Sequence, residues 1–219
     1  MVHVLLIIDP LPADQDDLQA QSISAIEQAI EQFPVSTESS VSIVCSDQPI
    51  ALQPADLLCP LTLNLPDSLA WKGQAIYKVC RDVEGLRDRV QRALLVPIAT
   101  GEFWLPIVLT AKGALYAEAI CREDSRYYQP LHLPDLHRQP LYRLAHRLLQ
   151  ELNAPPSVYL LQFGWTDGQI GFDRLYPFPA EAAIASLKVQ TPDLFACHWQ
   201  CLTSQPIFDV HIPGNLVWR

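Results

Sequence analysis

The sequence lacks any hydrophobic run long enough to cross a membrane. Its apolar runs, such as VLLII at residues 4–8 and VYLLQF at 158–163, are much shorter than the ~20 residues that a membrane-spanning helix needs. The opening residues MVHVLLIIDP also lack the basic region and the small-residue cleavage site of a signal peptide. We therefore expect a cytoplasmic protein with no membrane partner.

Positive charge is also scarce. The chain has 15 Lys and Arg against 24 Asp and Glu, which gives a net charge of -9. Nucleic acids and anionic membranes bind to positive surfaces, so this charge balance argues against both as general partners. A local basic patch within residues 138–147 stays open, and we expect no nucleic-acid partner.

The cysteines show no paired metal-binding or disulfide pattern. The chain has six of them, at positions 45, 59, 80, 121, 197 and 201, mostly inside apolar stretches. Buried, reduced thiols fit this pattern in a chain without an export signal.

Cys197, His198 and Cys201 form C-H-x-x-C, but on a helix His198 is rotated by about 100° from Cys197. No second motif supplies the remaining ligands of a structural zinc, so we predict helix packing and no metal.

The order of the predicted elements indicates an α+β fold. A strand at 2–9, a helix at 15–33 and a strand at 40–46 form a short βαβ-like segment, and we divide the chain into domains 1–54 and 55–219. The second domain is predicted to contain strands at 75–79, 103–110 and 114–121, helices at 82–95, 135–152 and about 192–203, a loop at 122–134, and a hairpin of 157–164 with 169–176. Strands interleaved with helices, together with antiparallel hairpins, predict one compact unit.

The segment Val158–Pro179, VYLLQFGWTDGQIGFDRLYPFP, resembles the metal-binding hairpin of the ATP-grasp ligases. The segment Trp71-Lys72-Gly73-Gln74-Ala75 resembles the end of the phosphate loop of the carboxyaminoimidazole ribonucleotide synthetase family. The ending FACHWQCLTSQPI is similar to that of the same family, with Phe195, His198 and Pro206 at typical positions. The resemblance covers about residues 55–207 and implies an ATP-grasp-like antiparallel sheet with helices.

The resemblance also shows which functional residues have changed. Where the family has a metal-binding Glu on the first strand and a second Glu twelve residues later, this chain has Gln162 and Arg174. The ligase reaction needs Mg²⁺ held by carboxylates to neutralise the nucleotide phosphates. An arginine cannot ligate Mg²⁺, so the resemblance implies that the ancestral chemistry is lost.

Two further groups of family residues have been replaced. Glycines of the phosphate loop let backbone N–H groups approach the phosphates, and Ser68 and Trp71 stand at two of these positions. The basic and polar run that handles substrate in the family has become apolar, with Phe178, Ala180 and Ile184 in place of an arginine and two histidines. Loss of loop, metal ligands and substrate ligands together implies relaxed or redirected function.

These observations lead to a first hypothesis, a catalytically inactive ATP-grasp relative that acts as a protein-binding, scaffold or regulatory factor. Its partner would be another protein or a second copy of the chain, and no cofactor or metal would be required. A related possibility is a subunit that completes a site with a partner chain.

The alternative hypothesis is a divergent ligase or sensor that binds ATP or ADP without the usual metal pair. An arginine can contact a phosphate directly. The nucleotide would be held by Lys72, Gly73, Gln74, Gln162 and Arg174. This hypothesis predicts that Lys72 and Arg174 converge on one cleft, and a cleft filled by Trp71 would count against it.

Aromatic residues gather around the predicted hairpin. Core packing of an antiparallel pair explains Phe163 and Phe172. For Trp165, Tyr176 and Phe178 two interpretations stay open, core packing or an exposed interaction surface, because exposed aromatic side chains often anchor protein contacts.

Overall fold

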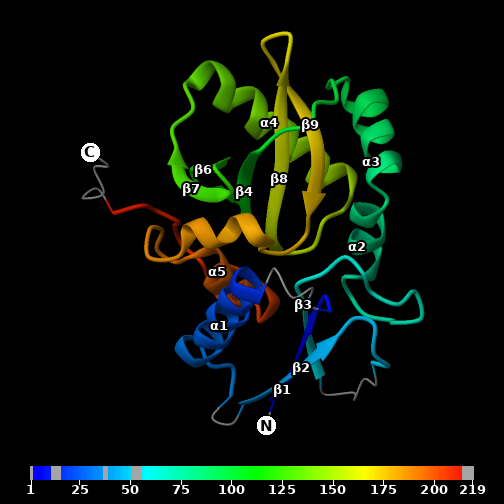
Figure 1. The fold of residues 1–219 in the computed structure, drawn as a ribbon, viewed down its shortest axis with the longest axis vertical. Coiled ribbons are helices and arrows are strands. Elements are labelled where there is room, and N and C mark those ends of the chain that lie inside the picture. Colours follow the sequence, from blue (N-terminus) through cyan, green and yellow to red (C-terminus); the bar gives the residue numbers. More distant parts are fainter. Residues whose placement is uncertain (1, 11–15, 37–38, 51–55, 214–219) are drawn as a thin grey trace.

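The computed structural model describes residues 2–10, 16–36, 39–50 and 56–213, and it contains two β-sheets flanked by helices (Figure 1). The parallel sheet has the order β2-β1-β3, with strands β1 (Val2–Ile8), β2 (Ser39–Cys45) and β3 (Asp56–Pro60). The antiparallel sheet has the order β7-β6-β4-β8-β9, with β5 also paired to β4. Its strands are β4 (Phe103–Thr110), β5 (Gly113–Tyr116), β6 (Ala119–Glu123), β7 (Arg126–Leu131), β8 (Ser157–Thr166) and β9 (Gln169–Tyr176).

The helices confirm the predicted α+β class. They are α1 (Asp16–Gln32), α2 (Gln74–Arg81), α3 (Val83–Arg89) continued by the π-helical turn η1 (Val90–Leu94), α4 (Asp135–Glu151), the 3-10 turn η2 (Glu181–Ser186) and α5 (Leu194–Leu202). Within the described ranges, none of them is long and apolar enough to cross a membrane. The predicted domain boundary between residues 54 and 55 lies outside the described residues.

Strand β1 is buried on both faces, as its continuous apolar run predicts. Val4 to Ile8 are each at most 5% exposed. Both neighbours, β2 and β3, run parallel to β1, and parallel sheets are covered on both sides. The βαβ-like start is therefore extended by β3 into a three-stranded sheet.

Residues 75–79 are helical, and their prediction as a strand was wrong. They lie within α2, whose buried residues are Ile76, Tyr77 and Cys80. The exposed Lys78 and Arg81 lie on its other face. This spacing follows the helical period, which a window of five residues does not reveal.

The predicted loop at 122–134 contains a strand instead. Strands β6 and β7 form a hairpin whose turn, Asp124 and Ser125, has positive φ angles of 47° and 61°. Such angles are typical of two-residue hairpin turns. Pro130 lies in β7, which is an edge strand of its sheet, where a residue without an N–H is tolerated.

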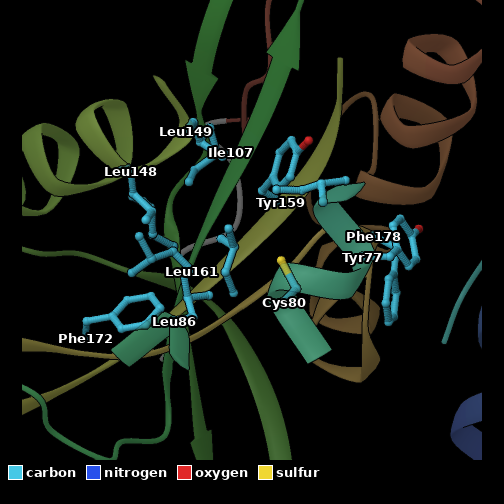
Figure 2. Close-up of a cluster of buried hydrophobic side chains, with 14 of the residues drawn as sticks. Tyr77, Cys80, Leu86, Ile107, Leu148, Leu149, Tyr159, Leu161, Phe172 and Phe178 are labelled. Carbon is cyan, nitrogen blue, oxygen red and sulfur yellow. The ribbon is translucent and has the colours of Figure 1, made fainter. Parts of the chain in front are cut away.

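The antiparallel sheet separates two hydrophobic cores. One core, between this sheet and helices α2, α3 and α4, contains Tyr159 and Leu161 of β8 (Figure 2). The other core, toward α1 and α5, contains Val158 and Leu160 of the same strand. Successive side chains of a strand point to opposite faces, so β8 contributes to both cores in alternation.

Helix α5 joins the two sheets. It packs on β4 and β8 on one side and on α1 on the other (Figure 1). Trp199 is fully buried, and its Nε1 donates a hydrogen bond of 2.9 Å to the carbonyl of Phe33, just after α1. Gln205 donates a second bond, of 3.0 Å, to the same carbonyl. These contacts fix α1 against the larger sheet.

A buried ion pair holds α3 against β9. The side chain of Asp173 is 1% exposed and that of Arg87 is 19% exposed. Arg87 Nη2 donates to Asp173 Oδ1, and Arg87 Nε donates to the Asp173 carbonyl at 3.0 Å. Hydrogen bonding to Asp173 is the main cause that raises the pKa of Arg87. The backbone N–H of Gly101 donates to the second carboxylate oxygen at 3.2 Å.

Replacing this arginine should destabilise the fold. In Arg87→Leu the buried Asp173 carboxylate loses its charged partner, and we expect the free energy of unfolding to fall by about 3 kcal/mol. The matched control is Arg92→Leu, because Arg92 is 81% exposed and pairs with Asp88 on the helix surface. It should cost less than about 1 kcal/mol. Urea unfolding measures both, and equal losses would contradict the structural role of the pair.

Candidate functional site

Gln162 and Arg174, at the two positions expected to bind metal, lie directly opposite each other on β8 and β9. The Gln162 Nε2 donates a hydrogen bond of 2.6 Å to the carbonyl of Gly101. The side-chain amide of Gln162 is therefore bonded to the backbone of the segment that contains Gly101. Its remaining oxygen carries no charge.

The carboxylate nearest in sequence to these two residues, Asp173, is neutralised by arginines. Besides its pair with Arg87, its Oδ1 lies 3.8 Å from Arg174 Nε. Mg²⁺ takes oxygen ligands, chiefly carboxylates, and a guanidinium repels it. Across the described ranges there is also no cluster of three or more His, Cys, Asp or Glu that could hold a metal ion. The residues at this position do not fit a magnesium site.

The segment that resembles a phosphate loop is covered by an indole ring. A Cβ atom at Gly73 would lie 2.2 Å from Cζ3 of Trp71, so the ring sits against the Gly73 backbone. Trp71 also packs edge-on against Tyr77, at 4.9 Å between ring centroids. Gln74 donates to the carbonyl of Asp67 at 2.9 Å, at the start of α2. Trp71 therefore occupies space that a phosphate would need in order to approach Gly73.

Lys72 lines a cavity at the open end of the hairpin, together with Ser157 and Pro177. This cavity is mainly apolar, has a volume of about 270 Å³ and includes Trp71, Tyr77 and Tyr159. Neither Gln162 nor Arg174 is among the residues that line it. Lys72 and Arg174 therefore do not share this cavity, whereas a shared phosphate site requires that they line the same one.

Comparison with solved structures identifies the architecture. N5-carboxyaminoimidazole synthetase from Staphylococcus aureus in complex with ADP superposes with a TM-score of 0.73 at 8% identity, over 96% of this chain and 80% of that one. The chain has the ATP-grasp fold. N5-carboxyaminoimidazole ribonucleotide synthetase from Thermotoga maritima gives a TM-score of 0.71 at 8% identity, over 97% of this chain and 78% of that one.

The likeness extends to an ATP-grasp ligase of different specificity. L-amino acid ligase from Bacillus licheniformis superposes with a TM-score of 0.61 at 10% identity, over 92% of this chain and 74% of that one. No protein-family model and no curated protein matches the sequence. At such low identity the ATP-grasp likeness establishes the fold alone.

The aromatic residues of the ATP-grasp hairpin divide between core and surface. Phe163 and Phe172 are fully buried, as predicted. Phe178 is 4% exposed and stacks on Tyr77 at 5.7 Å, which places it in the core and not on an interaction surface. Tyr176 is half-buried, and Trp165 is 37% exposed near the hairpin turn.

A polar cluster that the sequence analysis missed lies where the strands of the parallel sheet end. Asp9 follows β1 directly, and its Oδ1 accepts hydrogen bonds from Thr62 at 2.6 Å, Asn64 at 2.9 Å and Ser46 at 3.4 Å. Ligands of parallel α/β sheets bind outside the carboxyl ends of the strands. The position of Asp9, just after a buried strand and before a helix, was the signal that could have identified it.

Asp9 lines a second cavity, of about 280 Å³, together with Tyr127 and Glu181. The Tyr127 hydroxyl donates to Glu181 Oε2 at 3.1 Å. Burial, followed by the nearby Glu181 carboxylate, raises the pKa of Tyr127 to about 12. These two residues were missed because Tyr127 was assigned to a loop and Glu181 to an apolar run.

The C-H-x-x-C segment packs inside α5. The Cys197 thiol faces the carbonyl of Pro192 and the Cys201 thiol that of Leu109, so the two sulfurs lie against different parts of the chain. His198 is 1% exposed, and its Nδ1 lies 3.2 Å from the hydroxyl of Ser157. Among the residues that the structure describes, its Nε2 has no hydrogen-bond partner. Burial lowers the pKa of His198 from 6.5 to about 3.

This buried histidine predicts a pH-dependent stability. Since the folded state favours neutral His198, its contribution is complete above the unfolded pKa of 6.5 and is lost as the pH falls toward about 3. Wild type should lose about 2 kcal/mol more than His198→Gln between pH 7 and pH 5, because glutamine cannot titrate. Urea unfolding at both pH values tests this, with His146→Gln on the exposed face of α4 as control. Equal losses in wild type and His198→Gln would contradict the prediction.

Proposed function

We propose that the protein is catalytically inactive as an ATP-grasp ligase and acts as a protein-binding, scaffold or regulatory factor. The pairing of Arg174 with Gln162 across the hairpin, beside a carboxylate already bound by Arg87, carries this proposal. The ligase reaction requires carboxylates that hold Mg²⁺ against the nucleotide phosphates. Here the fixed charge at that position is positive, which disfavours a divalent cation.

The phosphate segment supports the same proposal. Backbone N–H groups bind phosphates only where nothing bulky blocks their approach. Trp71 covers Gly73, and Phe178, at a position where the family has an arginine, packs in the core. The hairpin residues, the phosphate segment and the substrate run thus serve packing or structural ion pairing.

An exposed apolar groove supports a role in protein binding. It has a volume of about 400 Å³ and lies between the end of η1, the start of α4 and the hairpin turn. Leu95 and Leu136, which line it, are 85% and 77% exposed. Trp165 contacts the lining residue His137 edge-on, at 4.6 Å between ring centroids. Exposed large apolar side chains gathered in this way are typical of protein contacts, and the partner is another protein or a second copy.

A second candidate function is nucleotide binding without a metal. The Arg174 side chain is 38% exposed, and Asp173 Oδ1 lies 3.8 Å from its Nε, beyond hydrogen-bond distance. A guanidinium with free donors can bind a phosphate directly. This observation favours a sensor of ATP or ADP over complete loss of ligand binding.

Calorimetric titration with ATP and with ADP, each with and without Mg²⁺, separates the two functions. For the inactive binding protein we expect no heat of binding under any of the four conditions and no change in the melting temperature. Binding that requires Mg²⁺ would contradict the proposal, because it would require a metal site that these residues do not form.

Variants identify the residues behind any binding that is observed. Nucleotide binding that survives without Mg²⁺ and is lost in Arg174→Ala would establish the second candidate. Arg92→Ala, which removes an arginine that is 81% exposed and outside the hairpin, is the matched control and should bind as wild type does. Loss in Lys72→Ala alone would point instead to the separate apolar cavity.

A further inference from the structure

The cavity beside Asp9 lies where ligands of α/β sheets commonly bind. Strand β1 is central in its sheet. After β1 the chain forms β2 on one side of it and then β3 on the other, so the strand order reverses beside the carboxyl end of β1. Ligand sites occur in the crevice at such a switch point. The cavity is closed on its other side by the antiparallel sheet and η2. Residues of chemical interest that line it are Asp9, Gln19, Trp104, Tyr127, Tyr176 and Glu181.

Asp9 is held in place as a hydrogen-bond acceptor. The side chains of Ser46, Thr62 and Asn64 all donate to Oδ1, and Gln19 Nε2 donates to the Asp9 carbonyl at 3.0 Å. Within the described part of the chain, Oδ2 has no hydrogen-bond partner. A carboxylate fixed through one oxygen presents the other without needing to reorganise, which is the condition for efficient binding of a charged donor.

The charge of the cavity lining is entirely negative. Asp9 and Glu181 both line it, and no Lys, Arg or His is among the described residues that do. Two arginines contact the aromatic part of the lining from outside. Arg122 lies over the ring of Tyr127 at 5.8 Å, and its Nη1 is 3.6 Å from Glu102 Oε1. The charge of Arg174 acts on Tyr176, and its Nε is 3.8 Å from Asp173 Oδ1. Each of these arginines therefore has a carboxylate partner of its own.

Aromatic rings form a large part of the cavity wall. Trp104 and Tyr127 meet edge-on at 5.3 Å, and Tyr176 and Phe178 meet edge-on at 6.1 Å. The faces of such rings attract cations and also accommodate an apolar body. At about 280 Å³ the cavity is at the small end of the range for ligand sites, so its ligand is compact.

We propose that this cavity binds a compact organic cation, a protonated amine on an aromatic or apolar body. The ammonium group is bound by the carboxylates of Asp9 and Glu181, and the body packs against Trp104, Tyr127 and Tyr176. The chemistry of the lining excludes a phosphate-bearing ligand, because a phosphate would face two carboxylates and no partner of opposite charge. This inference does not depend on the proposed loss of ligase activity.

Calorimetric titration with phenethylamine at millimolar concentrations tests the inference directly. Two molecules of similar shape serve as controls, the neutral phenethyl alcohol and the anionic 3-phenylpropionate. We expect saturable binding of the amine, at least about tenfold weaker binding of the alcohol, and no binding of the acid, because a hydrogen bond to a charged group is worth a factor of about ten or more. No binding of the amine, or equal binding of all three, would overturn the proposal.

Two variants locate the binding. Glu181→Gln and Asp9→Asn remove one charge each while keeping the shape of the side chain, and Asp9→Asn keeps an Oδ1 acceptor for its three donors. Each should weaken amine binding by roughly tenfold. Glu151→Gln, at the exposed end of α4, is the matched control and should leave it unchanged. Circular dichroism confirms folding of every variant, and amine binding that is equal in folded Glu181→Gln and wild type would contradict the assigned site.

Discussion

Burial of β8 on both faces is the constraint on which the rest of the structure depends. Val158 and Leu160 point toward α1 and α5, whereas Tyr159 and Leu161 point toward the helices on the other face. If the helices on either face were removed, half of the side chains of β8 would be exposed. Burial of each large apolar side chain stabilises the fold by about 1.5–3 kcal/mol. The same alternation fixes the register that sets Gln162 against Arg174. The geometry of the ATP-grasp hairpin is thus maintained by packing and does not require its metal.

The hairpin contains a buried carboxylate whose negative charge must be balanced. The buried Asp173 carboxylate needs positive charge, and Arg87 supplies it from α3. A buried charge left without its partner is costly, so this pair is kept whatever the protein binds. Arg174 adds a second guanidinium, whose Nε lies 3.8 Å from Asp173 Oδ1. This position is therefore a structural junction between a helix and the sheet, held by ion pairing.

The sequence predicted the elements whose signals are local. The β8–β9 hairpin has its turn signal at Asp167 and Gly168, and β1 is a continuous apolar run, so both were predicted correctly. Helix α2 and the hairpin of β6 and β7 were not, because short segments carry ambiguous periodicity. Asp9 itself could have been identified from its place after β1, but its three donors could not, since they lie 37 to 55 residues away and meet only when β1, β2 and β3 pair.

The two altered regions are linked through one side chain. The positive charge of Arg174 at the hairpin acts on Tyr176 and opposes the rise of its pKa on burial, and Tyr176 also lines the cavity beside Asp9. At the hairpin, positive charge stands where a bound cation would need carboxylates. Near the cavity, Phe178 and Ala180 stand where the resemblance implies an arginine and a histidine, and the charged side chains that line the cavity are Asp9 and Glu181. The local charge is thus positive at the hairpin and negative in the cavity. The cationic ligand proposed for the cavity fits this distribution, because the two carboxylates attract it and no basic group among the described lining residues opposes it.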